Sequence, residues 1–236
     1  MIEEAKRIYR QVLSFDRETP RLLAFVRRGL AGTQQGLVVD VGCGYGRTLR
    51  SLRNAGLRAI GIDINPSIVA QNVGDGLDCC VPAEFPQKGL LADVMVMSHV
   101  IEHFAPHDLL KFVNDYLEFL RPEGYLVLAT PLLSDRFFDD FDHVKPYQPT
   151  GIGMVFGGEK SQVQYYGSTS LVLQDIWFRR SAYSIAFARG MYVKSWTTPL
   201  CQIFNFGSAL LFRASAGAIG RTSGWVGLFR KSGVVK

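Results

Sequence analysis

The fold of this chain is decided by the stretch Leu37-Val38-Val39-Asp40-Val41-Gly42-Cys43-Gly44-Tyr45-Gly46. Its first five residues form a short apolar and β-branched run, which predicts a buried strand. Three glycines follow at alternate positions, and glycine can take positive φ and leaves no Cβ in the way of a ligand. A helix is expected next, from about Arg47 to Asn54. This order of strand, glycine loop and helix predicts a loop whose backbone approaches a ligand closely.

Strands and helices alternate along the rest of the chain. Apolar and β-branched runs predict strands at 57–63, 78–81, 93–97, 124–130, 162–166 and 225–230. Helices are expected after Asn65, which would cap a helix with Pro66 at its first position, and over 107–120. The alternation predicts an α/β fold, a three-layer sandwich around a mostly parallel seven-stranded sheet, with ligands bound at the carboxyl ends of the strands.

The next acid narrows the class of ligand. Asp63 ends the second predicted strand, and a carboxylate there can accept hydrogen bonds from both hydroxyls of an adenosine ribose. The glycine spacing differs from the dinucleotide pattern G-x-G-x-x-G, because the third glycine comes one residue early. A further acid, Asp40, directly precedes the loop. Together these features favour a nucleoside cofactor other than a nicotinamide dinucleotide.

This combination resembles the class I S-adenosylmethionine-dependent methyltransferases. The resemblance is also carried by Gly61-Ile62-Asp63, by His99-Val100-Ile101-Glu102-His103 and by the segment 120–125, and it covers about residues 35–150. It returns in the final strand, 224–231. The resemblance implies a Rossmann-like methyltransferase fold and S-adenosyl-L-methionine as the cofactor.

The resemblance also implies residues that bind the cofactor. Gly42 and Gly44 would line the methionine moiety, Asp63 would bind the ribose, and Asp40 would support the loop, with the methionine ammonium as a potential partner. The acid that usually holds the adenine amino group falls on Pro82 here, so Ala83 or Glu84 is expected to contact adenine instead. The remaining expected cofactor contacts are Cys43, Gly46, Ile64 and Ser98.

The catalytic candidates are histidines, because transfer to a hydroxyl requires a base that works near neutral pH. His143 is the favoured base or substrate ligand, and His99 and His103 are further candidates. Structural roles remain open: His99 could terminate its strand, His103 belongs to a Glu-His pair that is often structural, and His107 opens a helix.

A divalent metal is an alternative that we do not favour. Its ligands would be His99, Glu102, His103 and His143, which is similar to the arrangement in small-RNA terminal 2′-O-methyltransferases. There a metal binds both sugar hydroxyls, and a bound metal can lower the pKa of a hydroxyl.

The carboxyl-terminal part of the chain is basic. Residues 171–236 contain nine Lys and Arg and one acid, a net charge of +8, whereas residues 1–170 carry a net charge of −3. We expect one domain over residues 1–236, with N-terminal helices in 1–31 (2–14 and 20–31), a cofactor-binding core at 35–150 and a basic, aromatic helical insertion at 171–219 before the last strand. The insertion could be a lid that also forms a homodimer, a contact with an anionic membrane, or a nucleic-acid site. Its apolar content at 199–212 favours burial or a membrane over RNA.

The sequence therefore predicts a methyltransferase that acts on an oxygen of a small molecule, a sugar or a lipid-linked glycan. One alternative is a metal-assisted RNA ribose 2′-O-methyltransferase, and another is a catalytically inactive cofactor-binding partner or regulator. The four cysteines lack a paired metal pattern and the N-terminus lacks the apolar core of a signal peptide. A cytoplasmic location is therefore expected, with peripheral contact to the inner face of the membrane as an addition.

Overall fold

The computed structural model describes residues 15–33, 35–157 and 163–234. Its centre is a seven-stranded sheet with the order β3-β2-β1-β4-β5-β7-β6. β1 to β5 are parallel, and β7 runs antiparallel to both β5 and β6. The strands are β1 (Leu37–Val41), β2 (Arg58–Ile62), β3 (Cys79–Cys80), β4 (Ala92–Ser98), β5 (Leu120–Pro131), β6 (Thr169–Ser181) and β7 (Arg221–Val234). The predicted mostly parallel seven-stranded sheet is confirmed.

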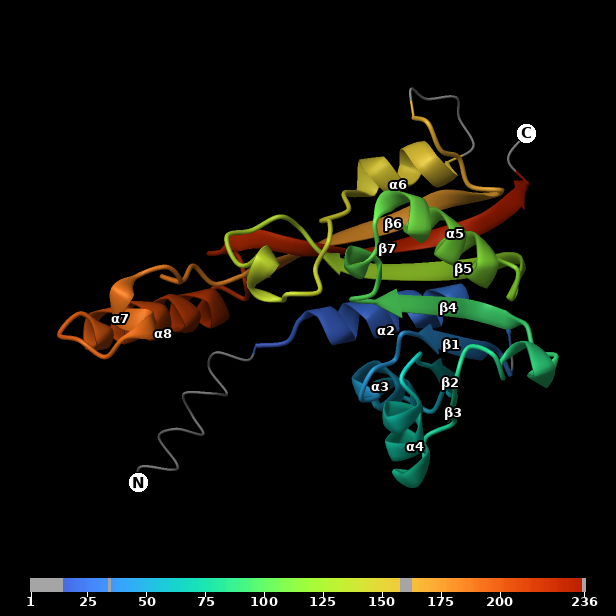
Figure 1. Cartoon of the computed structure of the whole chain (residues 1–236), viewed down its shortest axis with the longest axis horizontal. Helices are drawn as coiled ribbons and strands as arrows, with labels where there is room; N and C mark the ends of the chain where they lie inside the picture. Colours follow the sequence, from blue (N-terminus) through green and yellow to red (C-terminus); the bar gives the residue numbers. More distant parts are fainter. Residues whose placement is uncertain (1–14, 34, 158–162, 235–236) are drawn as a thin grey trace.

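Helices cover both faces of this sheet, which confirms the three-layer sandwich (Figure 1). The helices are α2 (Glu18–Gly29), α3 (Arg47–Asn54), α4 (Pro66–Gly74), α5 (Pro106–Leu117), α6 (Pro149–Phe156), α7 (Arg189–Tyr192) and α8 (Thr198–Ala214). Short 3₁₀ helices lie at η1 (Pro86–Lys88), η2 (Ile101–His103) and η3 (Phe137–Asp139). The expected helix over 2–14 lies outside the described residues.

The core divides into two layers because successive side chains of a strand point to opposite faces. Val38 packs with α2 on one face, whereas its neighbour Val39 packs with α5 and α6 on the other. β1 is buried along its whole length, as expected for a central parallel strand covered on both sides. The sheet therefore holds the carboxyl ends of β1, β2 and β4 in fixed positions at one edge.

Two predictions near the end of the chain are wrong. The described residues 163–166 contain no strand, and the sixth strand is β6, at Thr169–Ser181. Residues 171–181 were expected to be helical and instead form most of this strand. The reason is non-local: β6 is an edge strand, and its conformation is set by its long antiparallel register with β7.

Helices do occupy the part of the insertion beyond β6. We call residues 182–220, which contain α7 and α8 and connect β6 to β7, the helical arm. The helical arm projects beyond the edge of the sheet where β4 and β5 end (Figure 1). Among the described residues, no helix is long and apolar enough to cross a membrane.

Candidate functional site

The glycine loop after β1 has the conformation that the sequence predicts. Gly42, Gly44 and Gly46 have φ values of 69°, 49° and 74°. A Cβ on Gly42 would come within 2.5 Å of Val100 Cγ2, so this glycine is required for close packing against the segment after β4. The Cβ position of Gly44 has no described atom within 4 Å. The open face of Gly44 is therefore where the backbone can meet a ligand.

Asp63 holds the loop from the neighbouring strand end. Its Oδ2 accepts a hydrogen bond from the amide of Gly44 at 2.8 Å, and its Oδ1 accepts one from the amide of Asn65 at 2.9 Å. Each carboxylate oxygen keeps a second lone pair, which a ribose hydroxyl can use. Ile64 is 85% exposed beside it, an apolar surface against which a flat ring can pack. Asn65 caps α4 by accepting from the amide of Ser67, as predicted.

Asp40 lies beneath the loop with only 1% of its surface exposed. Burial, together with the negative charges of Cys79 and Asp63, raises the pKa of Asp40 to about 8. Its Oδ2 has no hydrogen-bond partner among the described residues. A buried carboxyl with an unused oxygen fits a cation supplied by a ligand, because such a charge would favour the ionised form. The residues present therefore fit a cationic nucleoside cofactor.

The side chain of Cys43 points away from the open face of the loop. Its Sγ is buried 3.4 Å from Cys79 Sγ, and Asn72 fixes the same region by donating to the carbonyl of Gly44 at 2.8 Å. The thiol pair shares a hydrogen bond that lowers the pKa of Cys79 and raises that of Cys43. Only the backbone of Cys43 is therefore placed to contact a cofactor.

The adenine side of the predicted site is more open. Ala83 and Glu84 are exposed in the turn after β3, and Glu84 Oε2 accepts a long bond of 3.3 Å from the amide of Val81. Because β3 pairs with β2, this turn lies at the same sheet edge as Asp63. Ser98 is the last residue of β4 and lies at that edge as well.

His99 is part of an ion-pair network. It has a φ of 57°, a left-handed conformation that is rare for a residue with a side chain. Its Nε2 lies 2.8 Å from Glu18 Oε1 and its Nδ1 lies 3.3 Å from Glu102 Oε1. Burial alone would lower the pKa of His99, but its contacts with Glu102 and Glu18 outweigh burial and raise it to about 9. The two carboxylates therefore favour the protonated form of His99 at neutral pH, although Arg179 Nη1 also lies 3.2 Å from its Nε2.

Glu18 and Arg179 are site residues that the sequence did not reveal. Glu18 lies in α2, and its Oε2 accepts from Arg179 Nη1 at 2.7 Å across 161 positions of sequence. The charges of His99, Arg179 and Arg47 lower the pKa of Glu18 against the opposing effect of burial. Neither residue lies in a recognisable motif, so no local signal could have found them.

His103 and His143 lie together beside this network, with ring centroids 5.0 Å apart. His103 Nδ1 contacts the carbonyl of Asp142 at 3.1 Å, and His143 Nδ1 contacts the carbonyl of Phe137 at 2.6 Å. A carbonyl can only accept, so each Nδ1 carries the proton and, in the neutral ring, each Nε2 is left as an acceptor. The side chain of His143 is only 13% exposed. The structure thus provides two oriented imidazoles whose Nε2 atoms can bind a proton or a metal.

Three of the four potential metal ligands come together. The donor atoms of Glu102, His103 and His143 lie within 4.8 Å of one another, and His99 is not a member of this group. Glu102 is fully buried, and its Oε2 accepts from Thr130 Oγ1 at 3.0 Å. A ring N–H held by a carbonyl is also the usual orientation of histidines that bind metals. This group could hold a divalent ion.

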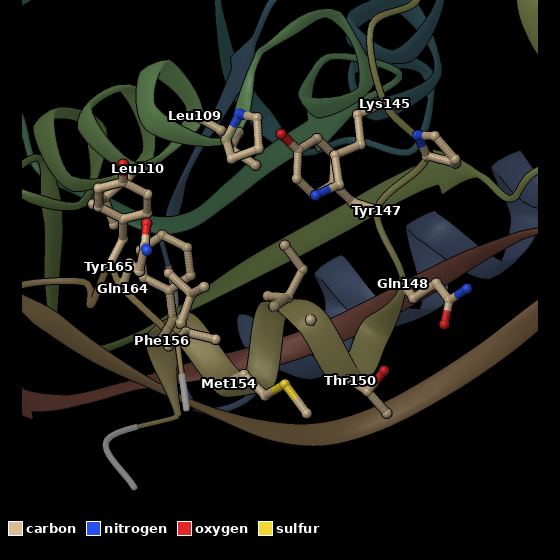
Figure 2. A pocket seen from close by; sticks show the side chains of 16 residues that line it. Leu109, Leu110, Lys145, Tyr147, Gln148, Thr150, Met154, Phe156, Gln164 and Tyr165 are labelled. Atoms are coloured by element: carbon tan, nitrogen blue, oxygen red, sulfur yellow. The ribbon is translucent and has the colours of Figure 1, made fainter. Parts of the chain in front are cut away.

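A cavity of about 500 Å³ lies between α5 and α6 (Figure 2). The backbone amide of Lys145 donates to the carbonyl of Glu102 at 3.1 Å, and the Tyr147 hydroxyl donates to the carbonyl of Phe104 at 2.9 Å. These bonds place one wall of the cavity beside η2. The rest of the lining is mainly apolar and includes Leu109, Leu110, Ile152, Met154, Val155, Phe156 and Val163.

Comparisons with known proteins identify the family and the fold. The sequence profile of a family described as a methyltransferase domain matches residues 10–183. The fold is similar to that of a SAM-dependent methyltransferase from Archaeoglobus fulgidus (TM-score 0.58, 20% identity, 96% of this chain and 99% of that chain covered). It is also similar to a protein assigned as a sarcosine dimethylglycine methyltransferase from Galdieria sulphuraria (TM-score 0.54, 17% identity, 92% and 85% covered). No curated protein matches the sequence.

Proposed function

The chain belongs to the class I S-adenosylmethionine-dependent methyltransferases, and from this premise we propose that it methylates an oxygen atom of a small-molecule, sugar or lipid-linked glycan acceptor. S-adenosyl-L-methionine, the cofactor, supplies a methyl group on a sulfonium that leaves readily. The protein must hold the cofactor, align the acceptor and remove its hydroxyl proton. The observation that carries the proposal is the His103–His143 pair, whose Nδ1 atoms are both oriented by backbone carbonyls.

The loop residues are suited to hold the cofactor. Gly44 offers an open backbone face, Asp63 offers carboxylate lone pairs to the ribose hydroxyls, and Asp40 offers a buried carboxyl to a positive charge. Exposed Ile64 offers an apolar surface to the adenine ring. These contacts fix the cofactor at the carboxyl edge of the sheet, which is where parallel α/β sheets bind ligands.

We assign the role of general base to His143. Its Nδ1–H bond to the Phe137 carbonyl fixes the ring and leaves Nε2 as the acceptor for the hydroxyl proton, in the same way that a carboxylate orients the histidine of a hydrolase triad. Asp140 Oδ2 lies 3.7 Å from this Nε2, where it can stabilise the imidazolium that forms. His103 is the second candidate, with the same tautomer. His99 is a poor base because its pKa of about 9 keeps it protonated at neutral pH. Both of its ring nitrogens contact carboxylates, so we assign His99 to holding Glu18 and Glu102 in place.

The cavity supports an acceptor with an apolar part. Most of the side chains that line the cavity are aliphatic or aromatic, and Lys145 and Gln148 add polar groups. Lys145 Nζ lies 5.4 Å from the centroid of the Tyr147 ring, so a cation is held near the histidine side of the cavity. An acceptor with a polar, anionic head and an apolar tail, such as a lipid-linked sugar phosphate, would match both halves.

Methyl transfer from isotopically labelled cofactor tests this proposal. The purified chain should be incubated with three acceptor classes: free sugars, nucleotide sugars and polyprenyl-phosphate-linked glycans. We expect label in at least one class, located on oxygen by fragmentation in the mass spectrometer, and a large loss of transfer in His143→Ala. Label on nitrogen or carbon, or undiminished transfer in the variant, would contradict the proposal.

The Glu102, His103 and His143 group supports a second candidate, metal-assisted methylation of an RNA ribose. Here these residues would bind a divalent ion that grips the two hydroxyls of a terminal ribose and lowers the pKa of one of them. Metal analysis after reconstitution with Mn²⁺ or Zn²⁺ separates the two candidates. A stoichiometric ion that is lost in His103→Ala, together with transfer to RNA 3′ ends, would replace the base mechanism.

A further inference from the structure

The helical arm carries an apolar surface that the described residues leave exposed. α8 has two faces: Cys201, Ala209 and Phe212 are buried toward the protein, while the opposite face is open. Ile203, near the middle of the open face, is 69% exposed. The apolar side chains of this face lie three and four residues after Leu200 and again seven residues after Ile203 and Phe204, so they form one stripe: Leu200, Ile203, Phe204, Leu210 and Leu211.

Three aromatic side chains extend this surface at the α7 end of the helical arm. Phe187, Tyr192 and Trp196 are all exposed, Trp196 to 80%. Large aromatic rings with a polar group, such as those of Tyr and Trp, are favoured at the boundary between lipid and water. Exposed rings and aliphatic side chains gathered on one short segment of a domain indicate an interaction site.

The charge on the helical arm has one sign. From residue 176 to the end of the chain there is no Asp or Glu. Arg189 and Lys194 are exposed near the three aromatic residues. A surface that combines cations, aromatic rings and an amphipathic helix, with no anion among them, is complementary to anionic lipid headgroups.

The base of the helical arm lies at the cofactor edge of the sheet. Pro131, the last residue of β5, pairs with Gly224 near the start of β7, and Ser181 at the end of β6 pairs with Arg221. Both ends of the helical arm therefore emerge at the carboxyl edge of β5. Figure 1 shows α7 and α8 projecting from this edge, clear of the sheet.

We propose that the helical arm docks the protein on an anionic lipid bilayer, with the stripe of α8 and the α7 aromatics placed among the headgroups. This proposal rests on the proposed function in one respect: if the acceptor is lipid-linked, docking brings it to the cofactor edge of the sheet. A second copy of the chain is a poorer occupant, since a two-fold contact through this surface would bring Arg189 and Lys194 of both copies together without an anion. Nucleic acid is a poorer occupant as well, because four of the five side chains of the stripe are aliphatic and give bases no ring on which to stack.

Vesicle flotation of the full chain tests this docking. Vesicles of phosphatidylcholine alone are compared with vesicles that also contain phosphatidylglycerol. We expect the chain to float with the anionic vesicles and to float less with the neutral ones. Two variants are measured alongside: Ile203→Ser with Leu211→Ser removes apolar contacts, and Arg189→Glu with Lys194→Glu reverses the charge.

Each double variant should bind anionic vesicles about tenfold more weakly or worse, because each lost cation and each lost apolar side chain contributes separately. The matched controls replace exposed residues elsewhere: Val73→Ser in α4 for the apolar pair, and Arg27→Glu with Lys88→Glu for the cations. Controls should float like the wild type. Flotation that is absent, or equal in wild type and arm variants, would overturn the proposal.

The remaining outcomes separate this proposal from the proposed function. A concentration-dependent dimer in light scattering that Ile203→Ser dissolves, with no flotation, would assign the surface to a second copy and refute docking. Thermal unfolding checks that the variants fold. Binding of S-adenosyl-L-methionine by the arm variants should equal that of the wild type, so a failure of docking would leave the methyltransferase assignment in place.

Discussion

Replacement of Asp40 by asparagine should stabilise the cofactor-free protein by an amount that grows with pH. The buried carboxyl of Asp40 has a pKa of about 8, against an ordinary value of 3.8. Because the folded-state pKa is raised, the folded state favours the protonated carboxyl. The stability that this proton provides is fully present below the unfolded-state pKa and is lost as the pH rises through about 8.

The size of the effect follows from linkage. Between the two pKa values the folded state loses about 1.4 kcal/mol per pH unit relative to a neutral side chain. From pH 5 to pH 7, the free energy of unfolding of Asp40→Asn should therefore rise by about 3 kcal/mol relative to that of the wild type. Urea unfolding at several pH values measures this difference. Asp78→Asn, at an exposed acid, is the matched control and should show no such trend.

Proton release on cofactor binding provides a second test of the Asp40 carboxyl. At pH 7 about nine tenths of Asp40 should be protonated in the free protein, given a pKa of about 8. A bound cation favours the carboxylate, so calorimetry in buffers of different ionisation enthalpy should detect release of up to about one proton in the wild type and none in Asp40→Asn. A stability difference that does not change with pH, together with equal proton release in both proteins, would refute this account of Asp40.

The remaining predictions concern the histidines and the loop. His143→Ala should lower kcat by about 10²-fold or more with cofactor binding retained, while His107→Ala, at an exposed histidine, should leave kcat unchanged; equal losses would exclude His143 as the base. Gly42→Ala should weaken cofactor binding and destabilise the fold by about 1–3 kcal/mol, because the added Cβ meets Val100 and φ is positive; unchanged melting would contradict the packing described for the loop. His99→Gln should destabilise the protein at pH 6 and less so above pH 9. Because the pKa of His99 is raised in the folded state, the stability from its ion pairs is fully present below about pH 6.5 and is lost as the pH rises through about 9. Equal destabilisation at both pH values, measured by urea unfolding, would argue against a charged His99.

Local signals predicted the cofactor side of the molecule well. The strand 37–41 and the helix 47–54 have the expected bounds, and Asn65 caps α4 as the sequence indicates. Each of these features depends on residues within a few positions of one another: buried β-branched residues, glycines that take positive φ, and a side-chain cap. Their conformations are therefore largely specified before tertiary contacts form.

Features that depend on distant contacts were not predicted. Residues 171–181 were expected to be helical, whereas they form most of β6. The expectation failed because the conformation of β6 depends on a register with β7, about fifty positions away. The network of Glu18, His99 and Arg179 joins three elements separated by about eighty positions each, with no motif at either new residue. Cys43 was expected to contact the cofactor, and the sequence did not show that its side chain turns inward to contact Cys79. Sequence placed His103 and His143 near one site, but only the carbonyl contacts reveal their tautomers.

Binding of S-adenosyl-L-methionine, measured by isothermal titration calorimetry, tests the central claim most directly. The wild type should bind one cofactor per chain with saturable heat. Asp63→Ala should bind at least about tenfold more weakly, since the carboxylate accepts from the Gly44 amide and, in the proposed site, from the ribose hydroxyls. Absence of binding heat in a folded wild type, or equal affinity in Asp63→Ala, would contradict the claim that this loop is the cofactor site.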